Sequence, residues 1–293
     1  MFNPFVEKND EKENDSRIIQ KVLEGDTNAL ESLIYRHQAW IYNIALKMVF
    51  DPDDAEDVTQ EILIKVLSHL SAYDASKAPF RTWLYRIVAN HVLNMRSRNN
   101  EVAVSRAYLD WNTAISPDTI EDRRLASRPE YRVLVEETRS MCLTGMLLCL
   151  ERRQRLVFIL GGLFGIPSSS GSEILDISDA NFRAILSRAR KKLANFMGER
   201  CGLVNSENPC RCESHVKKLI SAGWIDPEDL RLTRESLKKL SSIAEERAMA
   251  IDGEIGSVLK QFQDSSFYKG PDMTLQIREM IRNKELGDFF NIQ

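Results

Sequence analysis

Apolar residues recur every three to four positions through most of the first hundred residues of the chain. This spacing puts them on one side of a helix, which is typical of amphipathic α-helices that pack on a core. Asp26 or Thr27 is suited to cap the first of these helices. The acids of DPDD, residues 51–54, favour the start of the second, because carboxylates suit the positive end of a helix dipole. The pattern predicts three helices, over about 26–48, 53–70 and 80–98.

The helical pattern weakens after this region and returns later. The stretch SSSGSEIL (168–175), a turn at Asp176 and a basic helix capped by Ser178 predict a helix-turn-helix. Gly171 stands at the centre of that stretch, where glycine costs about 1 kcal/mol relative to alanine. We therefore expect this helix to be short, loose or reshaped. Because the period-2 alternation of strands is scarce throughout, we expect an all-α fold.

The same pattern predicts the organisation of the chain. We expect two helical domains joined by a linker, followed by a helical extension. The segments are an N-terminal tail (1–24), a helical-bundle domain (25–98), a linker that can contain a short helix (99–138), a helix-turn-helix domain (139–198) and a C-terminal extension (199–293).

Charge is segregated along the chain, although its net value is only −3. Residues 51–61 hold six carboxylates and no basic residue, whereas residues 81–98 hold four arginines and no acid. Residues 178–200 are mainly basic. The chain is therefore not a polycation, and binding to nucleic acid has to come from the local basic segments.

Several classes of protein are disfavoured by what the sequence lacks. The N-terminus has no uninterrupted apolar core of signal-peptide length, and no run of about 18 apolar residues occurs, so we expect a cytoplasmic protein that does not insert into a membrane. Five cysteines without a secretory signal argue against a disulfide scaffold. No phosphate-cradling glycine loop, nucleophile elbow or HExxH is present, so we do not expect an enzyme.

Three stretches together resemble a known family. They are DAEDVTQEILIKV (54–66), FRTWLYRIVANHVLN (80–94) and ISDANFRAILSRARKKL (177–193). The order along the chain is an acidic helix, a basic helix with aromatic residues and asparagines, a linker, and a basic helix-turn-helix. This order resembles the sigma-70 family of bacterial transcription initiation factors, in its extracytoplasmic-function (ECF) branch. The resemblance implies a non-catalytic factor that binds core RNA polymerase and directs promoter recognition and opening.

The resemblance also implies site residues. The helix after DPDD would dock onto the clamp helices of core polymerase, where acidic groups add complementarity and speed the encounter. The third helix and the loop before it would contact the minus-10 element of promoter DNA, with aromatic rings catching unstacked bases and arginines holding phosphates. The polymerase-binding positions are Asp54, Asp57, Gln60 and Glu61, and the minus-10 positions are Lys77, Phe80, Arg81, Trp83, Tyr85, Arg86, Asn90 and Asn94.

The last basic helix resembles the helix that reads the minus-35 element. Its N-terminal half would enter the major groove, where side chains contact base edges and phosphates. The positions implied are Ser178, Asn181, Arg183, Ser187, Arg188, Arg190 and Lys191.

Plainer interpretations stay open for each segment. The acidic turn can be capping and solvated surface, Phe80 and Trp83 can be core, and the basic helix can be a solvated face. Two other functions also remain. One is a polymerase-binding regulator that has lost promoter reading, and the other is a helix-turn-helix regulator that acts without polymerase. The extension is expected to be a regulatory module, and an anti-sigma factor or another regulator is a further candidate partner.

A cluster of metal-binding residue types follows the basic helix in CGLVNSENPCRCESH (201–215). The thiols of Cys201, Cys210 and Cys212 and the imidazole of His215 are a chemically sensible tetrahedral zinc set, although their spacing is not a standard finger pattern. Redox-sensitive thiols and unliganded structural cysteines are the other interpretations. No cofactor is required for the function that the resemblance implies, so a zinc ion here would be structural.

Overall fold

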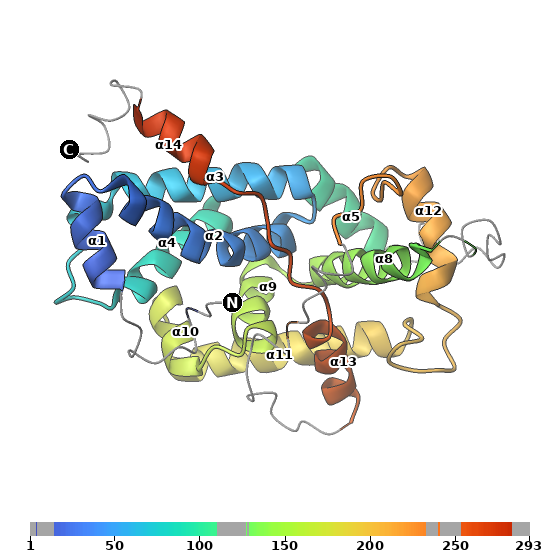
Figure 1. The fold of residues 1–293 in the computed structure, drawn as a ribbon. Coiled ribbons are helices and arrows are strands. Elements are labelled where there is room, and N and C mark those ends of the chain that lie inside the picture. The colour runs from blue at the N-terminus through green and yellow to red at the C-terminus, as the bar shows by residue number, and fades with distance from the viewer. Residues whose placement is uncertain are drawn as a thin grey trace. The chain divides into compact units, whose positions relative to one another are not determined.

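The computed structural model describes residues 4, 15–109, 127, 129–232, 240 and 253–282, and its regular structure is helical (Figure 1). Within these ranges, β structure is limited to an isolated bridge between Cys201 and Cys210. The all-α fold class expected from the sequence is confirmed. The chain divides into two compact units, which consist of Met1–Arg96, Ile166–Phe182 and Lys269–Gln293 on the one hand, and of Ser97–Gly165 and Arg183–Tyr268 on the other.

Helix α2 is the centre of the first unit. Every residue from 37 to 50 is buried, including the polar Asn43. A helix that is covered on all sides needs neighbours around it, and α1, α3, α4 and α14 all pack against α2. The helices of this unit are α1 (Asp15–Leu23), α2 (Thr27–Val49), α3 (Pro52–Ser68), the 3-10 turn η1 (Leu70–Ala72), α4 (Phe80–Asn94), α10 (Ser168–Leu175) and α14 (Thr274–Arg282).

The three helices predicted for the first hundred residues are present as α2, α3 and α4. Asp26 caps α2 by accepting hydrogen bonds from the backbone N–H groups of Asn28 and Ala29, at 2.9 and 3.1 Å. The carboxylate of Asp51 caps α3 in the same way, through Asp53 and Asp54 at 3.0 Å each. The DPDD stretch is therefore both the turn after α2 and the cap of α3.

The segment expected to be an N-terminal tail contains helix α1. Its residues Ile18, Ile19 and Val22 are buried against the rest of the unit. They stand one and four positions apart, which is the spacing of an amphipathic helix. The rest of the predicted tail, apart from Pro4, lies outside the described residues.

The second unit gathers parts of the predicted linker and extension. In α5, which lies inside the predicted linker, the buried carboxylate of Glu101 accepts hydrogen bonds from Arg152 at 3.0 Å and Arg155 at 3.1 Å, tying α5 to α9. Residues 110–126, 128, 233–239, 241–252 and 283–293 of these predicted segments lie outside the described residues. The elements here are α5 (Asn99–Leu109), α8 (Tyr131–Met146), η2 (Leu147–Cys149), α9 (Arg152–Phe158), the π-helical η3 (Ile159–Leu163), η4 (Cys212–His215), α12 (Val216–Ser221) and α13 (Glu254–Gln263).

The predicted helix-turn-helix is formed by α10 and α11 (Asp179–Gly198). Asp176 ends α10 in the left-handed conformation with φ 51°, and the hydroxyl of Ser178 accepts a hydrogen bond from the N–H of Asn181 at 3.2 Å. Helix α10 is short, with 8 residues, as expected. Packing explains why a glycine stands in α10, because a Cβ at Gly171 would overlap the buried ring of Phe182.

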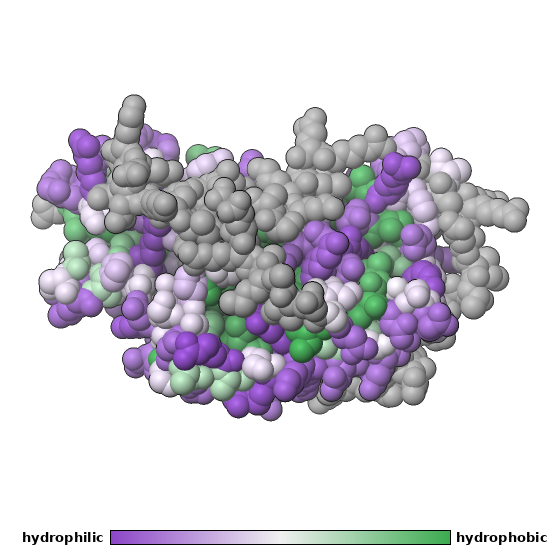
Figure 2. Space-filling view, turned by 90° about the horizontal axis from the view of Figure 1, so that it is seen from below, coloured by the Kyte–Doolittle hydropathy of each residue, from purple (hydrophilic) through white to green (hydrophobic). Residues whose placement is uncertain are grey.

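No helix in the described ranges is both long enough and apolar enough to cross a lipid bilayer. Over the face drawn in Figure 2, hydrophilic residues predominate among the described ones, and hydrophobic residues show between them in small patches. Large hydrophobic side chains that are exposed in the described structure, such as Tyr35, Trp224 and Leu275, are far apart in the sequence.

Replacing Gly171 by alanine tests the packing of α10. Alanine favours a helix by about 1 kcal/mol, but its methyl group overlaps the Phe182 ring. We expect Gly171→Ala to lower the free energy of unfolding by about 2 kcal/mol, in the range of overpacked cores. Urea denaturation followed by circular dichroism measures the change. Ser169→Ala, on the exposed side of the same helix, is the control and should be neutral or slightly stabilising; a more stable Gly171→Ala protein would contradict this account.

Candidate functional site

One side of α3 carries the acidic residues singled out in the sequence. Asp54, Asp57, Gln60 and Glu61 follow one another at intervals of three, three and one, so they share a face. Asp57 and Glu61 are exposed, while Asp54 and Gln60 are half-buried. The opposite side of α3, with Val58 and Ile62, is fully buried. The structure therefore brings these four residues together on an outward surface, which we call the acidic face.

Helix α4 lies beside α3 and presents side-chain amides. Asn90 and Asn94 are both exposed and lie one turn apart. The amide nitrogen of Asn94 donates to the backbone oxygen of Asn90 at 2.9 Å, and an amide oxygen is a hydrogen-bond acceptor. Between the two helices, the imidazole of His91 contacts the carboxylate of Glu61 at 3.2 Å. The acidic face and the amide pair are thus connected.

Two of the aromatic residues expected to stack on bases are part of the core instead. Phe80 is 4% exposed and Tyr85 only 1%. The Tyr85 hydroxyl lies 3.4 Å from the Nδ1 atom of His37, inside the unit. Helix α4 turns these positions inward because Leu84 and Val88 lie on the same side and pack in the core. In this conformation, Phe80 and Tyr85 are therefore buried and do not present their rings to a base, and base stacking by them stays a prediction.

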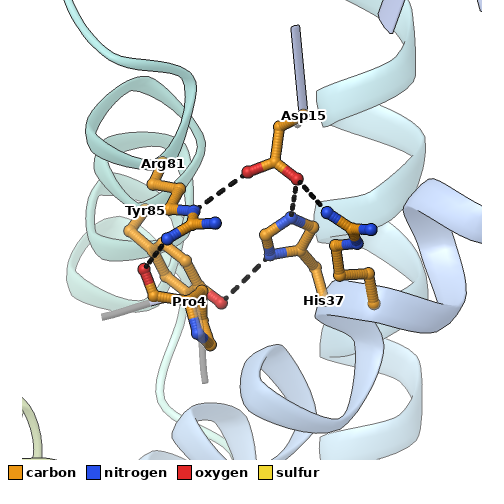
Figure 3. Close-up of polar contacts among 6 residues, drawn as sticks. Pro4, Asp15, His37, Arg81 and Tyr85 are labelled. Carbon is orange, nitrogen blue, oxygen red and sulfur yellow. Dashed lines mark hydrogen bonds and ion pairs between the residues drawn. The ribbon is translucent and has the colours of Figure 1, made fainter. Parts of the chain in front are cut away.

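Arg81 was expected to hold a DNA phosphate, but it binds a carboxylate of its own chain. Its Nε atom lies 2.9 Å from Asp15, which also pairs with Arg36 at 3.0 Å and approaches His37 at 3.7 Å (Figure 3). A second guanidinium nitrogen of Arg81 donates to the backbone oxygen of Pro4 at 3.1 Å. Asp15 is therefore a buried hub that joins α1 to α2 and α4.

Asp15 is ionised in this hub. Burial alone would raise the pKa of its carboxyl group, but hydrogen bonds and charges from His37 and Arg81 outweigh burial and hold the pKa well below its usual range. A buried carboxylate with such partners stabilises the fold only while they remain in place. The contact made by Arg81 thus has a structural role, which the sequence pattern did not indicate.

Trp83, the remaining aromatic residue predicted to stack on bases, lies in the first turns of α4, next to the loop that precedes this helix. The half-buried Trp83 packs against Tyr73 and Phe80, with ring centroids 5.4 and 5.6 Å apart. Tyr73 in turn donates its hydroxyl to the backbone oxygen of Ala78 at 3.2 Å, which fixes the shape of the loop. Lys77 stands at the tip of this loop with 83% of its side chain exposed, 3.4 Å from Asp74.

Arg86 lies on the same side of α4 as the amide pair, at four-residue intervals from Asn90 and Asn94. Its guanidinium donates a hydrogen bond of 2.8 Å to the backbone oxygen of Glu173, near the end of α10. Helix α10 packs against α4 within the first unit. In this conformation, the Arg86 position expected to bind DNA is engaged by the chain itself.

The basic helix α11 presents its predicted residues outward. Asn181, Arg183, Ser187, Arg188 and Lys191 are exposed, and so is the capping residue Ser178. Arg190 differs, because it is half-buried and its burial lowers the pKa of the guanidinium. Phe182, Ile185, Ala189 and Leu193 form the buried side of the helix. The polar side is therefore continuous along α11, apart from Arg190.

Cys201, Cys210, Cys212 and His215 line one small cavity of the second unit, together with Cys142 of α8. The Sγ atom of Cys210 lies 3.2 Å from Nε2 of His215, and both residues are buried. In the described part of the chain, however, no group of three or more His, Cys, Asp or Glu side chains is arranged to hold a metal ion. None of the five cysteines, all of which lie in the described ranges, forms a disulfide. The zinc site stays a prediction.

Sequence reasoning missed the residues that hold this site together. Asp15 fell in the predicted tail, and Tyr73 in a loop whose shape the pattern did not specify. The signal for α1 was present in the apolar positions Ile18, Ile19 and Val22 of SRIIQKVL. Nothing in the sequence pairs Asp15 with Arg81, because the two residues are 66 positions apart.

Comparison with known proteins adds two family matches. Residues 33–102 match the model of Sigma-70 region 2, and residues 140–193 match that of Sigma-70 region 4. The first match contains α3 and α4 with the acidic face and the amide pair. The second contains the helix-turn-helix as far as Leu193. Residues 194–293 lie outside both matches.

Individual proteins are similar over much of their own length. The RNA polymerase sigma-H factor of Pseudomonas aeruginosa is 35% identical over 133 residues, which is 43% of this chain and 68% of that protein. The ECF RNA polymerase sigma factor SigM of Bacillus subtilis is 29% identical, over 52% of this chain and 85% of its own. The ECF RNA polymerase sigma-E factor of Escherichia coli is 28% identical, over 62% and 93%.

The Asp15 hub can be tested by Asp15→Asn. The amide cannot neutralise the guanidinium groups of Arg36 and Arg81, so we expect the free energy of unfolding at pH 7 to fall by about 2 kcal/mol, less than for a fully buried pair because the arginines are partly exposed. Because the folded pKa of Asp15 is depressed, its contribution is complete above about pH 4 and is lost as the pH falls further.

Denaturation of both proteins between pH 3 and pH 7 provides the measurement. The difference between wild type and Asp15→Asn should shrink at the acid end of this range. Glu24→Gln, a change to an exposed acid just after the other end of α1, should leave stability almost unchanged. A difference that is constant from pH 3 to pH 7 would rule out an ionised Asp15 as the stabilising group.

Proposed function

The chain belongs to the sigma-70 family of RNA polymerase sigma factors, in its ECF branch, and we propose that it binds core polymerase through α3 and opens promoter DNA through α4. One observation carries the proposal. The acidic face of α3 and the amide pair of α4 lie on adjacent helices joined by the contact between Glu61 and His91. A polymerase bound to the first would have promoter DNA held close to the second.

Electrostatics supports α3 as the docking helix. Asp57 and Glu61 project into solvent, and Asp54 and Gln60 flank them, so a basic helical surface on the polymerase would meet acids and an amide over two turns. Exposed charges of this kind chiefly raise the rate of encounter and fix the register of the complex. The buried side of α3 keeps these residues in one orientation, because Val58 and Ile62 are anchored in the core.

Helix α4 has the chemistry needed to capture an open minus-10 element. The side chains of Asn90 and Asn94 are suited to pair with the edges of unstacked bases, and the half-buried indole of Trp83 is suited to stacking. Lys77 and Arg86 supply positive charge for phosphates. The role of Phe80, Arg81 and Tyr85 is structural in this arrangement, because they hold α4 against α1 and α2.

The helix-turn-helix supplies the second DNA contact. Asn181, Arg183 and Ser187 stand in the first half of α11, where a recognition helix meets base edges, and Arg188 and Lys191 follow on its exposed side. A regulator that used this element alone would not need the acidic face and the amide pair of the first unit. With a net charge of only −3 overall, the protein should bind DNA weakly until polymerase joins it.

The acidic face can be tested by the double substitution Asp54→Asn and Asp57→Asn. The amides keep the shape of the side chains but remove two charges, so we expect the Kd for bacterial core polymerase to rise about tenfold to a hundredfold at low salt. The loss should shrink as salt is added, because salt screens exposed charges. Fluorescence anisotropy of the labelled full-length protein measures both effects, with Glu24→Gln as control. Unchanged affinity would exclude α3 as the docking helix.

The amide pair can be tested by Asn90→Ala together with Asn94→Ala. Both side chains are exposed, so the fold should be kept. We expect promoter-dependent transcripts to fall at least about tenfold, as expected for the loss of two base contacts, while the affinity for polymerase stays within about twofold. Run-off transcription and anisotropy separate the two effects. Asn28→Ala, which removes an exposed amide from α2, is the control. Normal transcription by the double variant would count against promoter opening by α4.

A further inference from the structure

The C-terminal strap, which we define as residues 269–282, is part of the first unit and ends in helix α14 (Figure 1). We propose that this strap is a competitor built into the chain, which occupies the polymerase-docking surface until polymerase displaces it. The proposal rests on the function proposed above for α3. It assigns a role to a segment that lies outside both family matches.

Two apolar side chains anchor the strap. Met273 and Ile277 are four residues apart, on one side of the strap, and each is 1% exposed. Leu275, on the other side of α14, is 65% exposed. The helix is therefore amphipathic, and its apolar side is already covered by the first unit, because α14 packs against α2.

Polar contacts fix the strap in one register. The backbone N–H of Met273 donates to the buried side-chain oxygen of Gln38 on α2, at 2.9 Å. Arg278 pairs with Glu31, also on α2, at 2.8 Å. Before the helix, Gly270 has φ 71°, and a Cβ there would lie 3.0 Å from the ring of Tyr42. The chain passes close to α2 at this point, and the positive φ favours glycine.

The strap reaches the acidic face at Gln60. The amide nitrogen of Gln60 lies 3.8 Å from the Sδ atom of Met280, near the end of α14. A helix with its side chains is about 10–12 Å wide, and packed helices lie about 8–10 Å apart. A polymerase helix that covered Asp57, Gln60 and Glu61 would therefore overlap α14. Binding of the strap and binding of polymerase at this surface are mutually exclusive.

The strap is held in a way that allows release. The side chains of its ion pair are partly open to solvent, with 39% of Arg278 and 33% of Glu31 exposed. Such a pair contributes little once water and salt compete for it. The buried side chains of Met273, just before α14, and Ile277, on α14, form a small contact, which an extended polymerase surface can displace. The affinity for polymerase is then reduced by the fraction of molecules whose strap is closed.

The test compares two glutamate substitutions on opposite sides of α14 in the full-length protein. Ile277→Glu places a charge in the buried contact and should release the strap, so the Kd for bacterial core polymerase should fall at least about fivefold if the closed form is populated to about 80% or more. Leu275→Glu adds the same charge on the exposed side and should leave the Kd within about twofold. Anisotropy measures both, and circular dichroism checks that both proteins are folded.

A charge reversal tests the same contact without placing a charge in the core. Arg278→Glu alone sets two carboxylates against each other in place of an attractive pair, so it should tighten polymerase binding at low salt, and adding Glu31→Arg should restore the wild-type Kd by re-forming the ion pair. Equal Kd values for wild type, Ile277→Glu and Arg278→Glu would overturn the strap proposal while leaving the proposed function intact. If none of these proteins bound polymerase, the proposed function itself would fail, and the strap proposal with it.

Discussion

Burial of α2 on all sides is the constraint on which the first unit depends. Residues 37–50 have no exposed side. Each of the helices α1, α3, α4 and α14 therefore packs an apolar side against α2. Each neighbour is then left with one outward side. On α3 that side is acidic, and on α4 it carries amides and an arginine. Packing against α2 therefore determines which side chains of α3 and α4 face outward. The Asp15 hub adds a buried charge cluster that holds α1 and α4 in place.

The sequence predicted those parts of the fold that local periodicity determines. Helices α2, α3 and α4 and the helix-turn-helix follow from apolar spacing and from caps such as Asp26, Asp51 and Ser178. The orientation of single residues on α4 was harder to predict. Phe80, Arg81 and Tyr85 look like DNA-binding residues by type, but Phe80 and Tyr85 are buried and Arg81 pairs with Asp15, which is 66 positions away in the chain.

The features that the sequence did not predict depend on contacts between segments that are far apart in the chain. Gly171 looks like a weakness of α10 in the sequence, but the ring of Phe182 explains why no larger residue fits there. The meeting of Gln60 with Met280 joins residues 220 positions apart, and no local pattern indicates it. In the conformation described, Gln60 and Arg86 both contact other segments of the same chain. Engagement of polymerase and promoter would exchange these internal contacts for external ones.

The measurement that most directly tests the account is run-off transcription from a library of promoter fragments, with the full-length protein and bacterial core polymerase. Transcripts should begin at defined sites, with two shared sequence elements upstream of them, and the Ile277→Glu protein should give more transcript than wild type at limiting concentration. If neither protein directs transcripts above the level of core polymerase alone, although both are folded, the chain does not act as an initiation factor.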